Sequence, residues 1–328
     1  MATAVTLALT GDVMLGRMAN MVLLQNGPSY PWGNVRPYLQ SPELTLVNLE
    51  CVIATRGEPW ARWHKVFHFR ADPMALTALQ IAGVDGVVLA NNHVLDYEEE
   101  ALLEMLDLLE KNGMPYTGAG RNREEASRPM VLDAGGLRVG VVAFTDNEPG
   151  WAATASTPGT NWIPISLEEK SLRPVRESID RARQAGADLV VFSNHWGPNM
   201  VARPSRLFRE FARAVMDAGA DIYYGHSAHV CQGIEIYQGR PILYDTGDFV
   251  DDYAVDPELR NDRSLLFHLR LTPNGVERID LIPVKIDYCQ VNLARGADWE
   301  AIAQRITSLS AEMGTEVHRK GEQLWVEC

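Results

Sequence analysis

The chain has 328 residues, 46% of them hydrophobic and 22% charged, which is typical of a globular protein with a large buried core. Its formal net charge of -13 argues against nucleic acid or an anionic membrane as the main partner. The sequence contains no apolar run near the roughly 18 residues that a membrane-spanning helix needs, and its four cysteines are scattered. We therefore expect a cytoplasmic protein with reduced thiols and no membrane anchor.

Short apolar runs alternate with amphipathic segments along the chain, which predicts an α/β protein with a mainly parallel or mixed sheet covered by helices. The apolar runs predict strands at 5–10, 44–48, 86–90, 137–145, 188–193 and 221–224. The amphipathic segments predict helices at 97–112, 167–185, 205–218 and 299–312.

Beyond Gln232 the pattern changes to strands joined by tight turns. These strands are expected at 233–237, 241–245, 265–271 and 276–286. Without a repeat or a linker in the sequence, we expect one domain over residues 1–328. Residues 233–328 would complete a second sheet and add a C-terminal helix.

Polar residues follow the apolar strands at the point where each strand ends. Ligands of open α/β sheets bind just beyond the carboxyl ends of the strands, so these segments predict one shared site. They are Gly11-Asp12, Asn48-Leu49-Glu50, Asn91-Asn92-His93, Asn194-His195-Trp196 and Gly225-His226.

The side chains in these segments are suited to binding a transition metal. Carboxylate, imidazole and amide ligands together favour Zn, Mn or Fe over Ca. The candidate ligands are Asp12, Glu50, Asn92, His195, His226 and His229. His93 follows the candidate ligand Asn92 and is expected to donate a proton to a leaving group, as a general acid does.

The order of these motifs resembles the calcineurin-like metallophosphoesterase superfamily, in particular its poly-γ-glutamate capsule biosynthesis (CapA) branch. The resemblance implies a four-layer α/β/β/α sandwich with two mixed sheets. It also implies one or two metal ions and a catalytic set of Asp12, Glu50, His93 and His195. It rests on Gly11–Arg17, Asn48–Glu50, Phe69–Pro73, Ala90–Tyr97, His195–Gly197, Gly225–Val230 and Tyr244–Phe249.

Three motifs depart from the superfamily pattern. Met14 stands where the first motif, D-x-H, has its histidine, and Glu50 replaces an aspartate. His226 and His229 form H-x-x-H in place of H-x-H. These departures leave open a dinuclear site, a mononuclear site or a site without metal.

A set of basic and aromatic residues is expected to bind an anionic substrate, because arginine recognises carboxylate or phosphate in a bidentate way. As a strand of period 2, residues 64–70 would place His64, Val66, His68 and Arg70 on one face. A solvated edge strand is the alternative for this segment. The residues expected to bind substrate are Arg17, Lys65, His68, Arg70, Trp196 and Arg203.

The acidic run Asp245, Asp248, Asp251 and Asp252 indicates a solvated loop, with a catalytic Asp248 as the minor alternative. For the whole protein, the main hypothesis is a metal-dependent hydrolase or transferase in which a metal-activated water attacks a phosphoester or an anionic peptide-type substrate. A metal-independent peptide epimerase or racemase, using Asp or Glu against His as an acid/base pair, is the alternative. A non-catalytic binding protein comes third.

Overall fold

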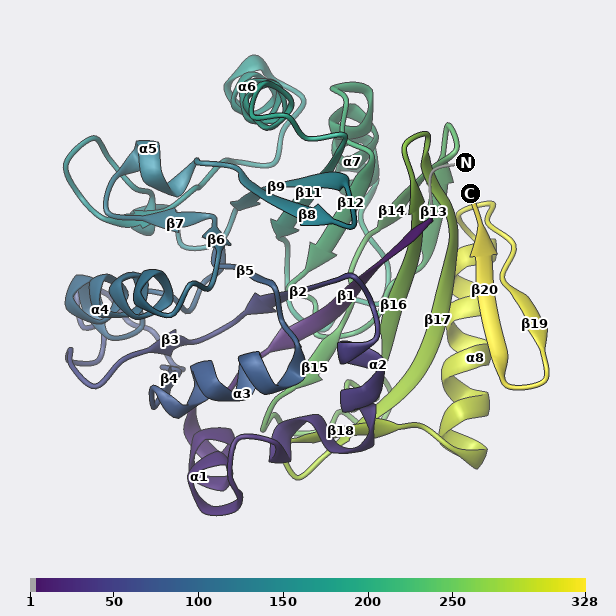
Figure 1. Ribbon diagram of the computed structural model, residues 1–328, viewed down its shortest axis with the longest axis horizontal. Helices are drawn as coiled ribbons and strands as arrows, with labels where there is room; N and C mark the ends of the chain where they lie inside the picture. The colour runs from purple at the N-terminus through teal and green to yellow at the C-terminus, as the bar shows by residue number, and fades with distance from the viewer. Residues whose placement is uncertain (1–3) are drawn as a thin grey trace.

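The computed structural model describes residues 4–328 and places two β-sheets face to face between layers of helices (Figure 1). The larger sheet has ten strands, with β19-β20-β17-β16-β1-β2-β5-β6 side by side, while β15 pairs with β1 and β18 with β17. Their bounds are β1 Val5–Val13, β2 Leu44–Leu49, β5 Gly86–Val88, β6 Tyr116–Thr117, β15 Asp248–Val250, β16 Arg263–Thr272, β17 Gly275–Asp287, β18 Gln290–Leu293, β19 His318–Lys320 and β20 Gln323–Glu327.

The smaller sheet has six strands in the order β13-β14-β12-β11-β9-β8. Their bounds are β8 Met130–Ala134, β9 Leu137–Thr145, β11 Leu189–His195, β12 Ile222–His226, β13 Ile234–Tyr237 and β14 Arg240–Leu243. Two further pairs of short strands are β3 (Val52–Ile53) with β4 (Arg70–Ala71), and β7 (Ala119–Gly120) with β10 (Gly159–Thr160).

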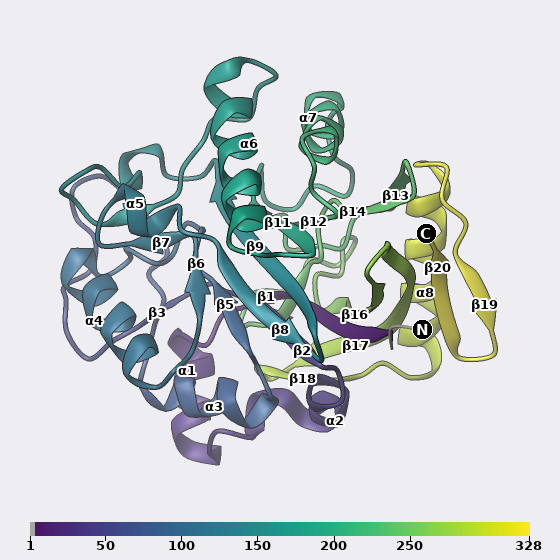
Figure 2. The same ribbon diagram turned by 45° about the horizontal axis from the view of Figure 1, so that its top comes forward.

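Helices cover the outer face of each sheet, with α6 and α7 above the sheets and α1 and α3 below them in Figure 1. The helices on the larger sheet are α1 Arg17–Asn26, α2 Arg36–Gln40, α3 Met74–Ala82 and α4 Glu98–Lys111. Those on the smaller sheet are α6 Glu169–Gln184 and α7 Arg206–Asp217 (Figure 2). The remaining helical turns are η1 Tyr30–Val35, α5 Arg123–Ala126 and η2 Pro149–Trp151.

The alternation of side chains along β1 shows why the two sheets pack together. Leu7 and Leu9 enter the core between the sheets, whereas Ala8 faces the core under α1 to α4. On β9, Val139 and Val141 point to the same inner core. Because both faces of each sheet are buried, the fold has four layers. The expected α/β/β/α sandwich is confirmed.

The strands after residue 232 divide between the two sheets. β13 and β14 extend the smaller sheet, while β16, β17, β18, β19 and β20 extend the larger one. Residues 233–328 therefore do more than complete a second sheet. The C-terminal helix α8 (Gly296–Ala311) contributes Trp299, Ile302 and Ile306 to the core between the sheets.

The expected strand at 64–70 is wrong. Residues 54–69 form an irregular loop between β3 and β4, and only Arg70 belongs to a strand. Alternate residues in this loop therefore share no common face. Among residues 4–328, no helix is long and apolar enough to cross a membrane.

Candidate metal centre

The polar cluster lies where strands of both sheets end. Asp12 is near the end of β1, and Glu50 directly follows β2 in the larger sheet. His195 and His226 are the last residues of the parallel neighbours β11 and β12 and lie directly opposite each other. Parallel pairing thus brings side chains from distant parts of the sequence to one place, as expected from the carboxyl ends of the strands.

Two glycines let the backbone pass close to the ligands. A Cβ atom on Gly11 would lie 2.2 Å from the carbonyl oxygen of Gly247. One on Gly225 would lie 2.1 Å from the carbonyl oxygen of Tyr244. Any side chain at these positions would push segment 244–248 away from the site, which explains the glycine before Asp12 and before His226.

One group of ligand atoms centres on Asp12 and two histidines. The Nδ1 atoms of His195 and His226 are 2.9 Å apart, and they lie 3.9 Å and 3.7 Å from Asp12 Oδ1. Asn48 donates a hydrogen bond of 2.7 Å to the same oxygen and so fixes the carboxylate. The ligand atoms of Asp12, His195 and His226 lie within 4.8 Å of one another, which is close enough to hold one ion.

A second group shares Asp12 and adds three residues. His229 Nδ1 lies 3.5 Å from Asp12 Oδ2 and 2.8 Å from Asp248 Oδ1. Glu50 completes this group, whose ligand atoms also lie within 4.8 Å of one another. Glu50 Oε1 lies 3.8 Å from His195 Nε2, so the two groups adjoin. Tyr253 donates a 3.1 Å hydrogen bond to Glu50 Oε2 and orients it.

Asp248 is the residue that sequence reasoning underrated. It belongs to β15, which pairs with β1 so that Asp248 lies opposite Asp12. The acidic run around it is not a solvated loop, because Asp245, Asp248 and Asp251 are buried. The signal in the sequence was a carboxylate after Gly247, but a strand of three residues is too short to be recognised by its pattern.

A strained turn aims His229 at the cluster. Ser227 and His229 have φ values of 113° and 60°, which non-glycine residues rarely adopt. Asp245 stabilises the turn by accepting hydrogen bonds from the N–H groups of Ala228 and Gly247. Backbone strain of this kind costs on the order of 1–3 kcal/mol per residue and is typical of functional sites.

Several buried ligand atoms in the cluster have no hydrogen-bond partner. They are Asp12 Oδ2, Glu50 Oε1, Asn92 Oδ1, His195 Nε2 and Asp248 Oδ2. An unpaired buried polar atom is costly, and an ionised carboxylate in that state is more so. Asp12, Glu50 and Asp248 belong to one group whose ligand atoms lie within 4.8 Å of one another, so a cation bound there would give these carboxylates a partner. These residues therefore fit a metal ion.

The electrostatics of the cluster lead to the same conclusion. Within residues 4–328, the carboxylates of Asp12, Glu50 and Asp248 form ion pairs with histidines and with no lysine or arginine. Burial, and then neighbouring carboxylates, raise the pKa of all three well above the usual range. Burial also lowers the pKa of His226 to about 3, so its ring is neutral and able to bind metal.

His93 lies beside these groups and is held from two sides. Its Nδ1 is 2.6 Å from Asp96 Oδ2, and its ring stacks on Phe69 at 3.9 Å between centroids. Its Nε2 lies 3.7 Å from Glu50 Oε1, so it faces the cluster. Burial lowers the pKa of His93 and raises that of Asp96 to about 7. This arrangement suits proton transfer through Nε2.

The residues expected to bind substrate are scattered. Lys65 is buried beside His93, where it donates to the carbonyl oxygen of Asn92 at 2.8 Å. Arg17 pairs with Asp252 and lies 4.9 Å from the centroid of Phe69. Both therefore lie close to His93: Lys65 through the neighbouring residue Asn92, and Arg17 through Phe69, which stacks on the His93 ring.

The other four lie away from the ligand atoms. Arg70 stacks on Tyr97 at 4.1 Å, and His68 Nε2 is 3.2 Å from the carbonyl oxygen of Trp60. Trp196 is buried among aromatic side chains, and its Nε1 donates to the carbonyl oxygen of Tyr244. Arg203 pairs with Glu312 at the surface. The structure places the Trp196 ring in the core and gives Arg203 a surface partner, and only the backbone N–H of Trp196 bonds a cluster residue, at the carbonyl oxygen of His226.

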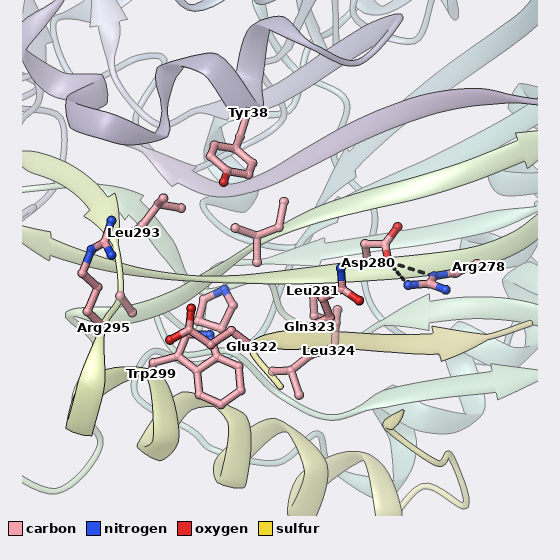
Figure 3. A pocket seen from close by; sticks show the side chains of 13 residues that line it. Tyr38, Arg278, Asp280, Leu281, Leu293, Arg295, Trp299, Glu322, Gln323 and Leu324 are labelled. Carbon is pink, nitrogen blue, oxygen red and sulfur yellow. Dashed lines mark hydrogen bonds and ion pairs between the residues drawn. The ribbon is translucent and has the colours of Figure 1, made fainter. Parts of the chain in front are cut away.

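A separate groove of about 540 Å³ lies between Tyr38 of α2 and Trp299 of α8 (Figure 3). Its charged pair, Arg278 and Asp280, is joined by a 2.8 Å hydrogen bond. None of its lining residues belongs to the polar cluster.

Comparison with known proteins gives matches over most of the chain. The family model described as "Bacterial capsule synthesis protein PGA_cap" matches residues 6–253. The capsule biosynthesis protein CapA of Bacillus anthracis is 30% identical over 283 residues, covering 86% of this chain and 67% of that protein. The PGA biosynthesis protein CapA of Bacillus subtilis is 30% identical over 278 residues, covering 84% of this chain and 70% of that protein.

A probable polyglutamine synthesis accessory protein of Mycobacterium tuberculosis is 29% identical over 366 residues, covering 98% of this chain and 95% of that protein. Among solved structures, a hypothetical protein from Thermus thermophilus matches with a TM-score of 0.50 and 17% identity. That match covers 85% of this chain and 99% of the other. At this identity the structural match supports the fold alone.

Proposed function

This chain belongs to the bacterial capsule synthesis protein family PGA_cap, and on that premise we propose that it is a metal-dependent hydrolase or transferase. Its substrate would be a phosphoester or an anionic peptide-type molecule. This proposal keeps the four-layer α/β/β/α fold that the structure shows and adds a specific activity to it.

The observation that carries the proposal is the set of five buried ligand atoms without hydrogen-bond partners. They come from segments far apart in the sequence, and three of them are carboxylate oxygens. A structural ion-pair network would place a lysine or arginine against those oxygens. Two groups that share Asp12 would hold one or two transition-metal ions.

When bound, such an ion supplies a water molecule of lowered pKa as the nucleophile. The protein's own residues would transfer the proton and exclude bulk water. Asp96 holds Nδ1 of His93, so that Nε2 is free to carry a proton to the leaving oxygen. Phe69 and Tyr253 cover this region with apolar surface and exclude bulk water from it.

A second candidate function is a metal-independent peptide epimerase, and one observation favours it. Two histidine–aspartate pairs, His93 with Asp96 and His229 with Asp248, each lie near Glu50. Two opposed acid/base groups are what removal and return of a proton at a substrate Cα atom require. Met14 offers no imidazole, and its sulfur already accepts the N–H of Gly16.

One experiment tests both functions. The purified protein is incubated with bis(4-nitrophenyl) phosphate and with peptides in deuterated water, each with and without Mn²⁺ and with chelator. Phosphodiester hydrolysis that requires Mn²⁺ is expected. Deuterium incorporation at a peptide Cα atom that chelator leaves unchanged would instead establish the epimerase and refute the metal-dependent proposal.

A further inference from the structure

The ammonium group of Lys65 is almost completely enclosed by protein. The side chain is 7% exposed, although lysine is rarely buried without a reason. It comes from the irregular loop 54–69 and reaches across to the segment that carries Asn92, His93 and Asp96.

Three oxygen atoms surround this ammonium group. It donates to the carbonyl oxygen of Asn92 at 2.8 Å, and it lies 3.4 Å from Asp96 Oδ1 and 3.7 Å from Glu148 Oε1. The ring of Trp151 lies 5.0 Å away and adds a cation–π contact. Of its three N–H donors, one is bonded to the carbonyl oxygen of Asn92, and the carboxylates of Asp96 and Glu148 lie at ion-pair distance on its other sides. Lys65 is therefore poorly placed to grip a substrate anion.

The contacts of Asp96 explain what this arrangement does. Asp96 Oδ2 lies 2.6 Å from His93 Nδ1 and also accepts the N–H of Phe69 at 2.6 Å. Its other oxygen, Oδ1, has Lys65 as its cationic neighbour. The carboxylate is thus hydrogen-bonded at Oδ2 and ion-paired with Lys65 at Oδ1, and it orients the ring of His93 through Nδ1.

We propose that Lys65 is a positioning residue, which ties loop 54–69 to the Asn92–Asp96 segment and keeps His93 Nε2 directed at Glu50. The inference rests on the proposed role of His93 in proton transfer. It assigns to Lys65 a role different from substrate binding. It applies to either candidate function, since each needs a fixed His93.

The test replaces Lys65 by Met, which keeps the length of the side chain and removes its charge and donors. Arg62→Met is the matched control, because Arg62 lies in the same loop and pairs with Glu98 and Glu99 at the surface. Protein labelled with ¹⁵N-histidine is studied by NMR with Zn²⁺ added and without metal. The Nδ1–H resonance of His93 is identified by its loss in His93→Gln.

Lys65→Met is expected to shift this resonance and to speed its exchange with water, while Arg62→Met leaves both unchanged. On bis(4-nitrophenyl) phosphate, kcat should fall about 10- to 100-fold with KM and metal content unchanged. If Lys65→Met does not fold, Lys65→Gln takes its place. An unchanged His93 resonance and exchange rate in a folded variant would overturn the inference. Because the NMR measurement needs no turnover, it stands even if the wild type hydrolyses nothing, an outcome that would count against the proposed function alone.

Discussion

Asp12 and Asp248 lie opposite each other on the parallel strands β1 and β15, and both are buried against the same imidazole, that of His229. Two ionised carboxylates in this position repel each other, and either a cation between them or a proton on one of them relieves the repulsion. Met14, where the first motif has its histidine, offers no imidazole, and its side chain lies in the apolar core with its sulfur accepting the N–H of Gly16. Asp248 instead adds a carboxylate to the group of Asp12, Glu50 and His229.

Asp248→Asn should weaken metal binding by about 10- to 100-fold while the fold stays intact, because one anionic ligand is lost. Binding of Mn²⁺ measured by titration calorimetry would show the change. Asp256→Asn is the matched control, since Asp256 lies in the same segment and only accepts backbone N–H groups of Glu258 and Leu259. Equal Mn²⁺ affinity in the Asp248 and Asp256 variants would show that Asp248 is not a metal ligand.

His93→Gln should lower turnover by about 100-fold and leave metal content unchanged, because general acid–base catalysis contributes on the order of 10²–10⁴. Asp96→Asn should give a smaller loss in the same direction, since it removes the acceptor of the His93 Nδ1–H group. Both are measured as kcat and KM on one phosphodiester, together with metal analysis. A variant that loses its metal instead would place His93 among the ligands.

Gly11→Ala should destabilise the protein by about 2 kcal/mol or more, because its Cβ atom would overlap the carbonyl oxygen of Gly247. The same shift would displace Asp248, so metal affinity should fall as well. Chemical unfolding and metal titration of the variant test both effects. A variant with wild-type stability would show that segment 244–248 adapts more readily than the contact distance implies.

Asp146, which is not itself a candidate ligand, provides a test of pH dependence. Burial raises its pKa from 3.8 to about 6, although it accepts the N–H of Gly197. Its folded form therefore favours the proton, and the wild type loses stability as pH rises from the unfolded value through the folded one. Asp146→Asn should be more stable by about 3 kcal/mol near neutral pH, a gain that disappears below about pH 4. Urea unfolding at both pH values measures it, and a gain of the same size at both would contradict this origin.

The fold was largely predictable because strand alternation and helix amphipathicity are local. The expected helix at 97–112 is observed as α4, Glu98–Lys111, and the expected strand at 137–145 as β9, Leu137–Thr145. The division of the C-terminal strands between two sheets was not predictable, because the partner of each strand depends on contacts between residues distant in sequence. A strand was expected at 64–70, within and just after loop 54–69, because alternating residue types can also occur in an irregular segment.

The site was predictable where a polar residue follows a long apolar strand, as with Asp12 and His195. Asp248 and Tyr253 follow no such strand, and only tertiary packing brings them to Glu50 and His229. Trp196 was placed at the site because it adjoins His195, yet its ring turns into the aromatic core of Phe208, Phe211 and Tyr223. A position next to a ligand in sequence does not fix the direction of a side chain.

The most direct test of the metal centre is elemental analysis of protein purified without chelator, compared with Asp12→Ala and His195→Ala. We expect one or two transition-metal ions per chain in the wild type and a loss of metal in both variants, which should remain folded by circular dichroism. A wild type without metal, even after addition of Mn²⁺ or Zn²⁺, would contradict the account. The two histidine–aspartate pairs would then have to act as metal-free acid and base.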